Sequence, residues 1–118
     1  MVMLHACSHN PTGFDLTQYQ WRTLMEIIQR KKLLPYFDMA YQGFATGDLS
    51  RDNWAVRLFA DNGIPIMCGT SFAKNMGLYG ARTGTLSVVC DSQKEATNVQ
   101  SQLNKVARNC WSSPPMHG

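Results

Sequence analysis

One lysine, in the stretch GTSFAKNMGLYGARTG (residues 69–84), has surroundings that are unusual for a charged side chain. Lys74 follows a strand-like run, and its neighbours along the chain include Phe72, Met76 and Leu78. Burial disfavours the charged form of an amine, and a neutral amine is a usable nucleophile. The stretch therefore indicates either an incidental lysine or an amine that takes part in chemistry.

Further polar groups follow each of the predicted strands. At the end of the first strand they are His9 and Asn10, at the end of the second Asp38 and Tyr41, at the end of the third Ser71 and Lys74, and one loop further on Arg82. Taken singly, each has an ordinary structural explanation, since Asp forms turns and Tyr fills cores. In parallel sheets, however, ligands bind beyond the carboxyl ends of the strands, so we expect these groups to lie at one edge.

The elements that must position these groups alternate along the chain. Strands are predicted at residues 2–7, 33–40, 64–71 and 83–90. Helices are predicted from a cap at Asp15 or Thr17 to Lys31, from a cap at Ser50 to Gly63, and from a cap at Asp91 or Ser92 to Trp111. Strands that alternate with helices predict βαβ units, and hence an α/β fold with a parallel sheet.

The composition predicts a single globular domain. Of the 118 residues 44% are hydrophobic and 16% charged, which is enough apolar material for a packed core. The net charge of +3 is scattered along the chain, so we expect neither nucleic acid nor a membrane surface as a partner. No apolar run approaches the roughly 20 residues that a membrane-spanning helix needs.

Four cysteines are spread along the chain without a C-x-x-C pair: Cys7, Cys68, Cys90 and Cys110. The first residues, MVMLHAC, have no basic segment and too short an apolar run for a signal peptide. Reduced, buried thiols and an intracellular compartment are therefore expected.

Two other kinds of site have partial signals in the sequence, a zinc site and a phosphate-binding P-loop. His5, Cys7 and His9 alternate, so an extended strand would place them on one face, as a zinc site requires. No fourth ligand is evident nearby, so we expect no metal, with both histidines in the core or just behind the site. The stretch around Lys74 also lacks the Gly-Lys-Ser/Thr ending of a phosphate-binding P-loop.

Four segments together resemble a known family. HACSHNPTG, FDMAYQGFATGDL, TSFAKNMGLYGARTG and KVARNCWSSPP match, in order and separation, the fold-type I pyridoxal-phosphate enzymes and specifically the aspartate aminotransferases of class I. The resemblance implies a partial three-layer αβα large domain with a mostly parallel sheet and one antiparallel strand. Family members are several times longer, so residues 1–118 are expected to be part of the cofactor-binding large domain, without its upstream part or the C-terminal small domain. Departures from the family pattern are Ala81, where an acidic residue is usual, and Ser113, where asparagine is usual.

The resemblance implies pyridoxal 5'-phosphate as cofactor and gives each polar group a role. Lys74 would form the Schiff base and then move the substrate proton, and Asp38 would pair with the pyridine nitrogen. Tyr41 and Asn10 would reach the cofactor's phenolic oxygen, with Asn10 also close to the substrate. The Asn10–Pro11 peptide bond is predicted to be cis.

The remaining residues implied by the resemblance bind anions. Ser71 and Arg82 would bind the cofactor phosphate. Arg108 would reach into the neighbouring subunit's site and bind the side-chain carboxylate of a dicarboxylic substrate, which implies a homodimer.

The function that the resemblance implies is transamination between L-aspartate and 2-oxoglutarate, giving oxaloacetate and L-glutamate. One alternative is an aminotransferase of the same subgroup that accepts aromatic or kynurenine-type amino acids, because such enzymes keep all of these motifs. Another is a truncated fragment without catalysis. A cytoplasmic location is expected, with the mitochondrion as the alternative, because a transit region would precede residue 1.

Overall fold

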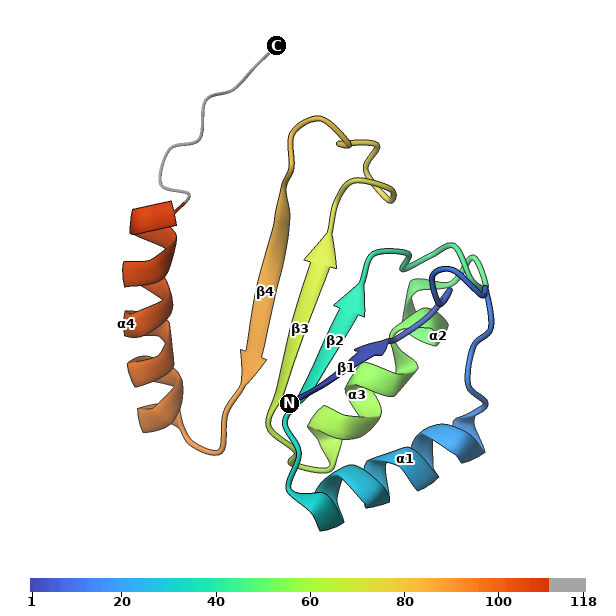
Figure 1. The fold of residues 1–118 in the computed structure, drawn as a ribbon, viewed down its shortest axis with the longest axis horizontal. Coiled ribbons are helices and arrows are strands. Elements are labelled where there is room, and N and C mark those ends of the chain that lie inside the picture. The colour runs from blue at the N-terminus through green and yellow to red at the C-terminus, as the bar shows by residue number, and fades with distance from the viewer. Residues whose placement is uncertain (111–118) are drawn as a thin grey trace.

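The computed structural model describes residues 1–110 and contains one four-stranded sheet with the order β1-β2-β3-β4 (Figure 1). The strands are β1 (Val2–His5), β2 (Pro35–Met39), β3 (Ile66–Ser71) and β4 (Gly84–Val89). The first three are parallel to one another, and β4 runs antiparallel to β3. This confirms the prediction of a mixed α/β fold whose sheet is mostly parallel with one antiparallel strand.

Helix α1 (Gln18–Lys31) begins and ends as its sequence predicts. The Thr17 hydroxyl accepts a hydrogen bond from the Gln20 backbone amide, and the Gln20 side chain accepts one from the amide of Thr17 in return. At the other end Lys32 adopts a left-handed conformation and its amide bonds to the last carbonyls of the helix. Of the two predicted caps, Thr17 is therefore the one used.

The prediction of a single helix from Ser50 to Gly63 is wrong. The segment forms two short helices, α2 (Leu49–Asp52) and α3 (Trp54–Asp61), with Asn53 between them. Asp48 caps α2 because its carboxylate accepts hydrogen bonds from the amides of Ser50 and Arg51, at 2.7 and 3.1 Å. Ser50 is thus inside the helix. Gly63 follows the end of α3 with a left-handed backbone conformation, close to the expected stop.

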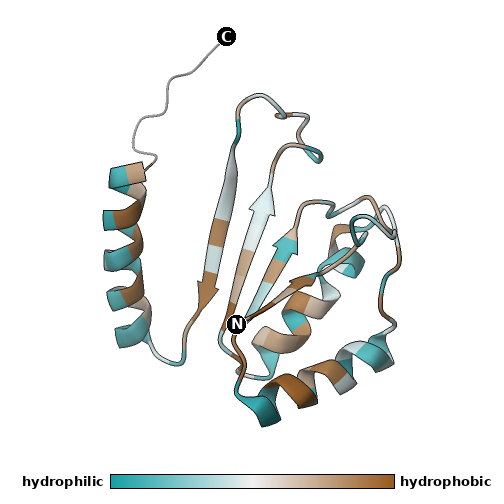
Figure 2. Cartoon of the chain, in the orientation of Figure 1, coloured by the Kyte–Doolittle hydropathy of each residue, from teal (hydrophilic) through white to brown (hydrophobic). Residues whose placement is uncertain are grey.

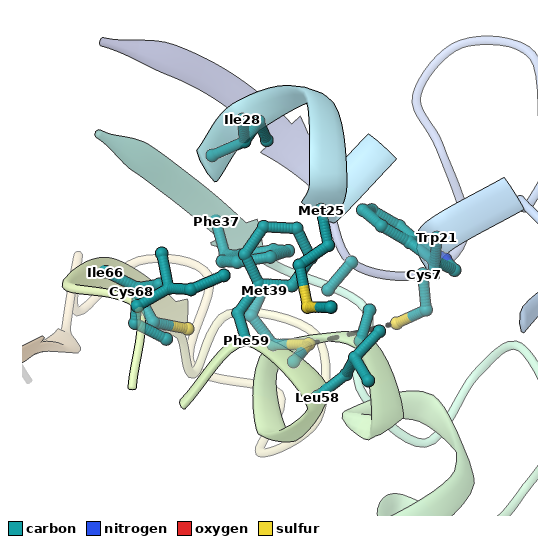
Figure 3. Packing of buried hydrophobic residues seen from close by; sticks show 13 residues of the cluster. Cys7, Trp21, Met25, Ile28, Phe37, Met39, Leu58, Phe59, Ile66 and Cys68 are labelled. Atoms are coloured by element: carbon teal, nitrogen blue, oxygen red, sulfur yellow. Dashed lines mark hydrogen bonds between the residues drawn. The ribbon is translucent and has the colours of Figure 1, made fainter. Parts of the chain in front are cut away.

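The core lies between one face of the sheet and helices α1 and α3 (Figure 3). Trp21 of α1, Phe37 of β2 and Phe59 of α3 form an aromatic cluster with ring centroids 5.1 to 6.3 Å apart. Phe37 and Phe59 have no exposed surface. Full burial of a side chain of this size contributes about 2–3 kcal/mol, so this cluster fixes the helices onto the sheet.

Strand β2 contributes alternate residues to the core and to the opposite face of the sheet. In β2 the residues Pro35, Phe37 and Met39 are buried, whereas the alternate residues Tyr36 and Asp38 are half-buried. Because side chains alternate along a strand, Tyr36 and Asp38 point to the sheet face opposite α1 and α3. Figure 2 shows that hydrophobic and hydrophilic residues are interspersed along β2 and along the helices.

Helix α4 (Gln93–Cys110) lies beyond the β4 edge of the sheet in Figure 1. Its start is capped by Ser92, whose hydroxyl accepts a hydrogen bond from the amide of Glu95 at 3.2 Å. None of its residues is buried. The predicted helix end at Trp111 and the departure at Ser113 lie outside the described residues. Within residues 1–110 no helix is both long enough and apolar enough to span a membrane.

All four cysteines are free thiols. Cys7 and Cys68 are buried, Cys90 is half-buried and Cys110 is exposed. The expectation of buried thiols is therefore correct for two of them and wrong for Cys110, because α4 contributes nothing to the core.

Candidate active site

A cavity of about 320 Å³ lies where β2 and β3 end and β4 begins. Asp38 from the end of β2, Ser71 from the last position of β3 and Arg82 from the loop before β4 line it together. The other lining residues are Tyr36, Gly69, Thr70, Ala73, Thr83, Gly84 and Thr85. The expectation that polar groups at the strand ends meet at one edge is confirmed for Asp38, Ser71 and Arg82.

The wall of the cavity depends on two glycines. A Cβ on Gly84 would come within 2.5 Å of the Thr70 carbonyl oxygen, so a larger residue would push β4 away from β3. A Cβ on Gly69 would collide with the hydroxyl of Tyr36, whose ring crosses that position. Tyr36 alternates with Asp38 along β2, so the two-residue period of the strand could have indicated it as a lining residue.

Lys74 lies beside the cavity, next to the lining residue Ala73. Its Nζ atom is 4.7 Å from the centroid of the Tyr41 ring, within the range of a cation–π contact. Lys74 and Phe72 are half-buried, whereas Met76 and Leu78 are exposed. The apolar neighbours at 76 and 78 therefore do not enclose the amine. The amine instead contacts Tyr41, which is far away in the sequence.

Asn10 is connected to Asp38 through a histidine. The backbone amide of Asn10 donates a hydrogen bond to His5 Nδ1 at 3.1 Å, so the ring proton of a neutral His5 is on Nε2. That atom lies 3.9 Å from Asp38 Oδ2. The ring of His9 stacks on His5 with centroids 4.8 Å apart. His5 therefore lies beside Asp38 with His9 stacked on it, and neither histidine is part of the buried core. The Asn10–Pro11 peptide bond is cis, as predicted.

The short loops at this edge are held by local hydrogen bonds. The Ser71 hydroxyl accepts a hydrogen bond from the amide of Ala73 at 3.2 Å. Arg82 has a left-handed backbone, with φ of 51°, and its guanidinium donates to the Tyr79 carbonyl at 3.3 Å. The hydroxyl proton of Ser71 and the remaining guanidinium donors of Arg82 stay available for a ligand in the cavity.

Arg108 is not brought to this cavity. It is exposed near the end of α4 and does not line the cavity. Its role as a residue that serves the site of a neighbouring subunit therefore stays a prediction.

The alternation of His5, Cys7 and His9 does not produce a shared face. Strand β1 ends at His5, and Ser8 has a positive φ of 48°, so the chain turns before His9. The Cys7 thiol instead contacts the Met39 sulfur at 3.9 Å in the core (Figure 3). Among residues 1–110 no three His, Cys, Asp or Glu side chains are placed to hold a metal ion.

The two buried thiols are poor nucleophiles. Burial, followed by the negative charges of Asp52 and Asp15, raises the pKa of Cys7 to about 12. Burial also raises the pKa of Cys68, although a hydrogen bond with Thr70 partly offsets this. Thiols with raised pKa values carry almost no thiolate at neutral pH. Neither thiol lines the cavity, so the amine of Lys74 is a better candidate for a nucleophile than either of them.

The arrangement suits one kind of ligand. A carboxylate on one strand end faces a cavity that also contains a hydroxyl and a guanidinium. A molecule that carries both a positively charged and a negatively charged group would match these side chains. The volume is within the usual range of small-molecule sites.

Comparison with known proteins gives a consistent result. The family model described as "Aminotransferase class I and II" matches residues 1–118. Mitochondrial aspartate aminotransferase of Gallus gallus is 52% identical over 118 residues, which are 100% of this chain and 28% of that protein. Cytoplasmic aspartate aminotransferase of Caenorhabditis elegans is 50% identical, again over the whole chain and 29% of that protein. The chain thus spans less than a third of the length of these relatives.

Solved structures are similar over nearly the same residues. The aromatic amino acid aminotransferase of Psychrobacter sp. B6, crystallised with aspartic acid, superposes with a TM-score of 0.92 at 49% identity. The aromatic-amino-acid aminotransferase of Burkholderia pseudomallei, covalently bound to pyridoxal phosphate, superposes with a TM-score of 0.91 at 46% identity. Each match covers 98% of this chain and 29% of the solved one. With a family model that matches from the first residue to the last, the chain belongs to the class I and II aminotransferases.

Proposed function

We propose that this chain is part of a pyridoxal-phosphate-dependent aminotransferase that converts L-aspartate and 2-oxoglutarate into oxaloacetate and L-glutamate. The cavity that unites Asp38, Ser71 and Arg82, with Lys74 beside it, is the observation that carries the proposal. Relatives at 50–52% identity named aspartate aminotransferases support the choice of substrate. Residues 1–118 would form part of the cofactor-binding large domain.

The cavity fits the cofactor by its donor set. Asp38 would hold a proton on the pyridine nitrogen, and the Ser71 hydroxyl and Arg82 guanidinium would bind the phosphate. When bound, pyridoxal phosphate supplies an electron-accepting ring that stabilises the negative charge left on the substrate carbon. Tyr41 and Asn10 would donate hydrogen bonds to its phenolic oxygen.

Lys74 would do the covalent and proton-transfer work of this chain. Its amine would hold the cofactor through the aldehyde carbon and, once displaced by the substrate amine, would take the proton from the substrate Cα. The ring of Tyr41 beneath it would limit where the amine can point. His5 would orient the Asp38 carboxylate, with the Nε2 proton facing it.

Substrate binding would need a second copy of the protein. Arg108 would bind the side-chain carboxylate of aspartate or 2-oxoglutarate in the neighbouring subunit's site, as a planar guanidinium binds a carboxylate in a bidentate way. The exposure of Arg108 on α4, away from the cavity of its own chain, is compatible with this role. The functional unit would accordingly be a homodimer.

A second candidate is an aminotransferase for aromatic or kynurenine-type amino acids. It is favoured by the two solved structures above, both aromatic amino acid aminotransferases. Loss of the cofactor absorbance band on adding L-aspartate, L-phenylalanine or L-kynurenine separately would rank these substrates. A faster reaction with L-aspartate supports the first proposal, and a faster reaction with an aromatic amino acid replaces it with the second.

A third candidate is a fragment without catalysis, and one experiment separates it from both enzymes. The purified chain is mixed with pyridoxal phosphate, its absorbance is recorded, and borohydride fixes any adduct for peptide mapping. We expect a discrete band that borohydride removes and an adduct on Lys74. Lys74→Ala should abolish both, whereas Lys94→Ala, at an exposed position of α4, should change neither. Adducts spread over the five lysines without a discrete band would support the inert fragment.

The relatives' names include mitochondrial and cytoplasmic enzymes. We propose the cytoplasm for this protein, and cell fractionation with an antibody against the chain tests that choice.

A further inference from the structure

Asp52 is the one buried charged or polar side chain among the described residues, with 4% of its surface exposed. No lysine, arginine or histidine within residues 1–110 forms an ion pair with it. Instead its carboxylate accepts four hydrogen bonds from a single turn. Oδ2 accepts from the amides of Gly43 and Ala45 at 2.7 and 3.1 Å. Oδ1 accepts from the amide and the hydroxyl of Thr46 at 3.1 and 2.6 Å.

The same turn is connected to Tyr41. The amide of Phe44, between two of the residues bound to Asp52, donates to the Tyr41 carbonyl at 3.0 Å. The Phe44 ring meets the Tyr41 ring edge to face, with centroids 6.4 Å apart. Gln42 is fixed separately, since its side-chain amide donates to the Leu49 carbonyl at 3.1 Å. Tyr41 is thus held by β2 on one side and by this turn on the other.

We infer that Asp52 is a positioning residue whose carboxylate fixes the 43–46 turn so that the Tyr41 ring lies under the amine of Lys74. Tyr41 follows the end of β2 by two residues, so the strand alone does not fix the direction of its ring. The turn that fixes it has a Gly at position 43, whose φ of 93° is unfavourable for other residues. A turn with this backbone needs an acceptor for its inward-pointing amides, and Asp52 supplies it.

A carboxylate is required at this position, and an amide would not replace it. Both oxygens of Asp52 receive donors, two on each side. An asparagine would turn its NH₂ group toward either the amides of Gly43 and Ala45 or the donors of Thr46. In either orientation at least one buried backbone N–H would lose its acceptor and face an NH₂ donor, which is more costly than the loss of one bond.

The chain offers a matched control for this substitution. Asp48 lies in the same segment and also accepts two backbone hydrogen bonds, but it does so as the cap of α2. Asparagine is as good a helix cap as aspartate. Asp48→Asn and Asp52→Asn therefore remove the same charge, and only Asp52→Asn removes acceptors from the turn.

The test reads the position of Lys74 without the cofactor. Protons that lie over an aromatic ring resonate upfield, so the ε-protons of Lys74 should be shifted relative to the other lysines, and Lys74→Arg assigns them. Asp52→Asn should abolish this shift, and amide exchange of Gly43, Ala45 and Thr46 should accelerate about tenfold or more. Asp48→Asn should leave both unchanged. A retained upfield shift in folded Asp52→Asn would overturn the inference.

A second variant covers the case in which Asp52→Asn does not fold. Thr46→Val keeps the carboxylate and removes the hydroxyl, which donates to Asp52 at 2.6 Å and also bonds to the backbone of Asp48. It should reduce the Lys74 shift partially, and an unchanged shift would again overturn the inference. Whether the position of the Tyr41 ring under Lys74 matters for catalysis rests on the proposed function. The chemical shift of Lys74 and the amide exchange rates can be measured whether or not that function is correct. Failure of pyridoxal phosphate to label Lys74 in the unsubstituted chain would count against the function alone.

Discussion

The hydroxyl of Tyr36 lies where a side chain on Gly69 would have to begin. The two residues are on neighbouring parallel strands, and both line the cavity that contains Asp38. Tyr36 can lie across β3 only because position 69 has no Cβ. The floor of the candidate site therefore depends on a pair of residues rather than on either residue alone.

Gly69→Ala should destabilise the protein, because the new methyl group collides with the Tyr36 hydroxyl in a packed sheet. Overpacking of this kind costs about 1–3 kcal/mol. Tyr36→Phe removes the atom that the methyl group would meet first, so the double variant should lose less than the sum of the two single changes. Urea denaturation of the four proteins measures this coupling. Strict additivity would show that the two side chains do not meet.

Arg82→Ala should weaken the binding of pyridoxal phosphate about 10- to 100-fold, the usual value of a charge-assisted hydrogen bond to phosphate. Pyridoxal, which has the same ring but no phosphate, should bind equally well to both proteins. Arg51→Ala removes an exposed arginine outside this cavity and is the matched control. Fluorescence titration with the two ligands gives the comparison. An equal loss for both ligands would show that Arg82 does not bind the phosphate.

Asp38→Asn should affect the chemical step far more than cofactor binding. The carboxylate would stabilise a protonated ring nitrogen, and electrostatic stabilisation of this kind is typically responsible for about 10²–10³ in rate. Single-turnover reaction of the loaded chain with L-aspartate measures the step, and cofactor titration measures binding. Equal losses in the two measurements would contradict the assignment of Asp38 to the ring nitrogen.

The order of elements and the edge where the polar groups meet could be predicted from the sequence, because both follow from local patterns. Alternation in β2 separates Phe37 from Asp38, and a cap at Thr17 starts α1. The break in the second helix was missed because it depends on a tertiary contact. Asp52 is the last residue of α2, and its carboxylate binds a turn that lies six to nine residues earlier in the chain. The helical periodicity of the sequence does not indicate this contact.

The surroundings of Lys74 also depend on a tertiary contact that local sequence patterns do not indicate. Its sequence neighbours Met76 and Leu78 suggested enclosure, yet they are exposed, and the ring that contacts the amine comes from Tyr41. Contacts between residues 33 positions apart are set by the sheet register and the loops, which a linear pattern does not contain. The resemblance between motifs indicated both residues but not their contact.

Cys7 should make the protein less stable as the pH rises above 9. Its pKa is raised from 9.0 to about 12 in the folded state, chiefly by burial, so the unfolded chain loses the thiol proton first. Between these two values the unfolded state binds fewer protons than the folded one. The free energy of unfolding therefore falls with rising pH, by up to about 1.4 kcal/mol per pH unit from this group, and the contribution is complete below pH 9.

Cys7→Ala should flatten that alkaline slope relative to the unsubstituted protein, although the lost packing lowers stability at every pH. Cys110→Ala, which changes an exposed thiol outside the core, should leave the slope as it is. Urea denaturation at several values between pH 8 and about pH 11 yields the slopes, with the linkage between proton binding and stability as the basis of the comparison. An unchanged slope in Cys7→Ala would mean that the thiol ionises as readily in the folded protein as in the unfolded chain. The packing of Cys7 against Met39 would then not exclude water from the thiol.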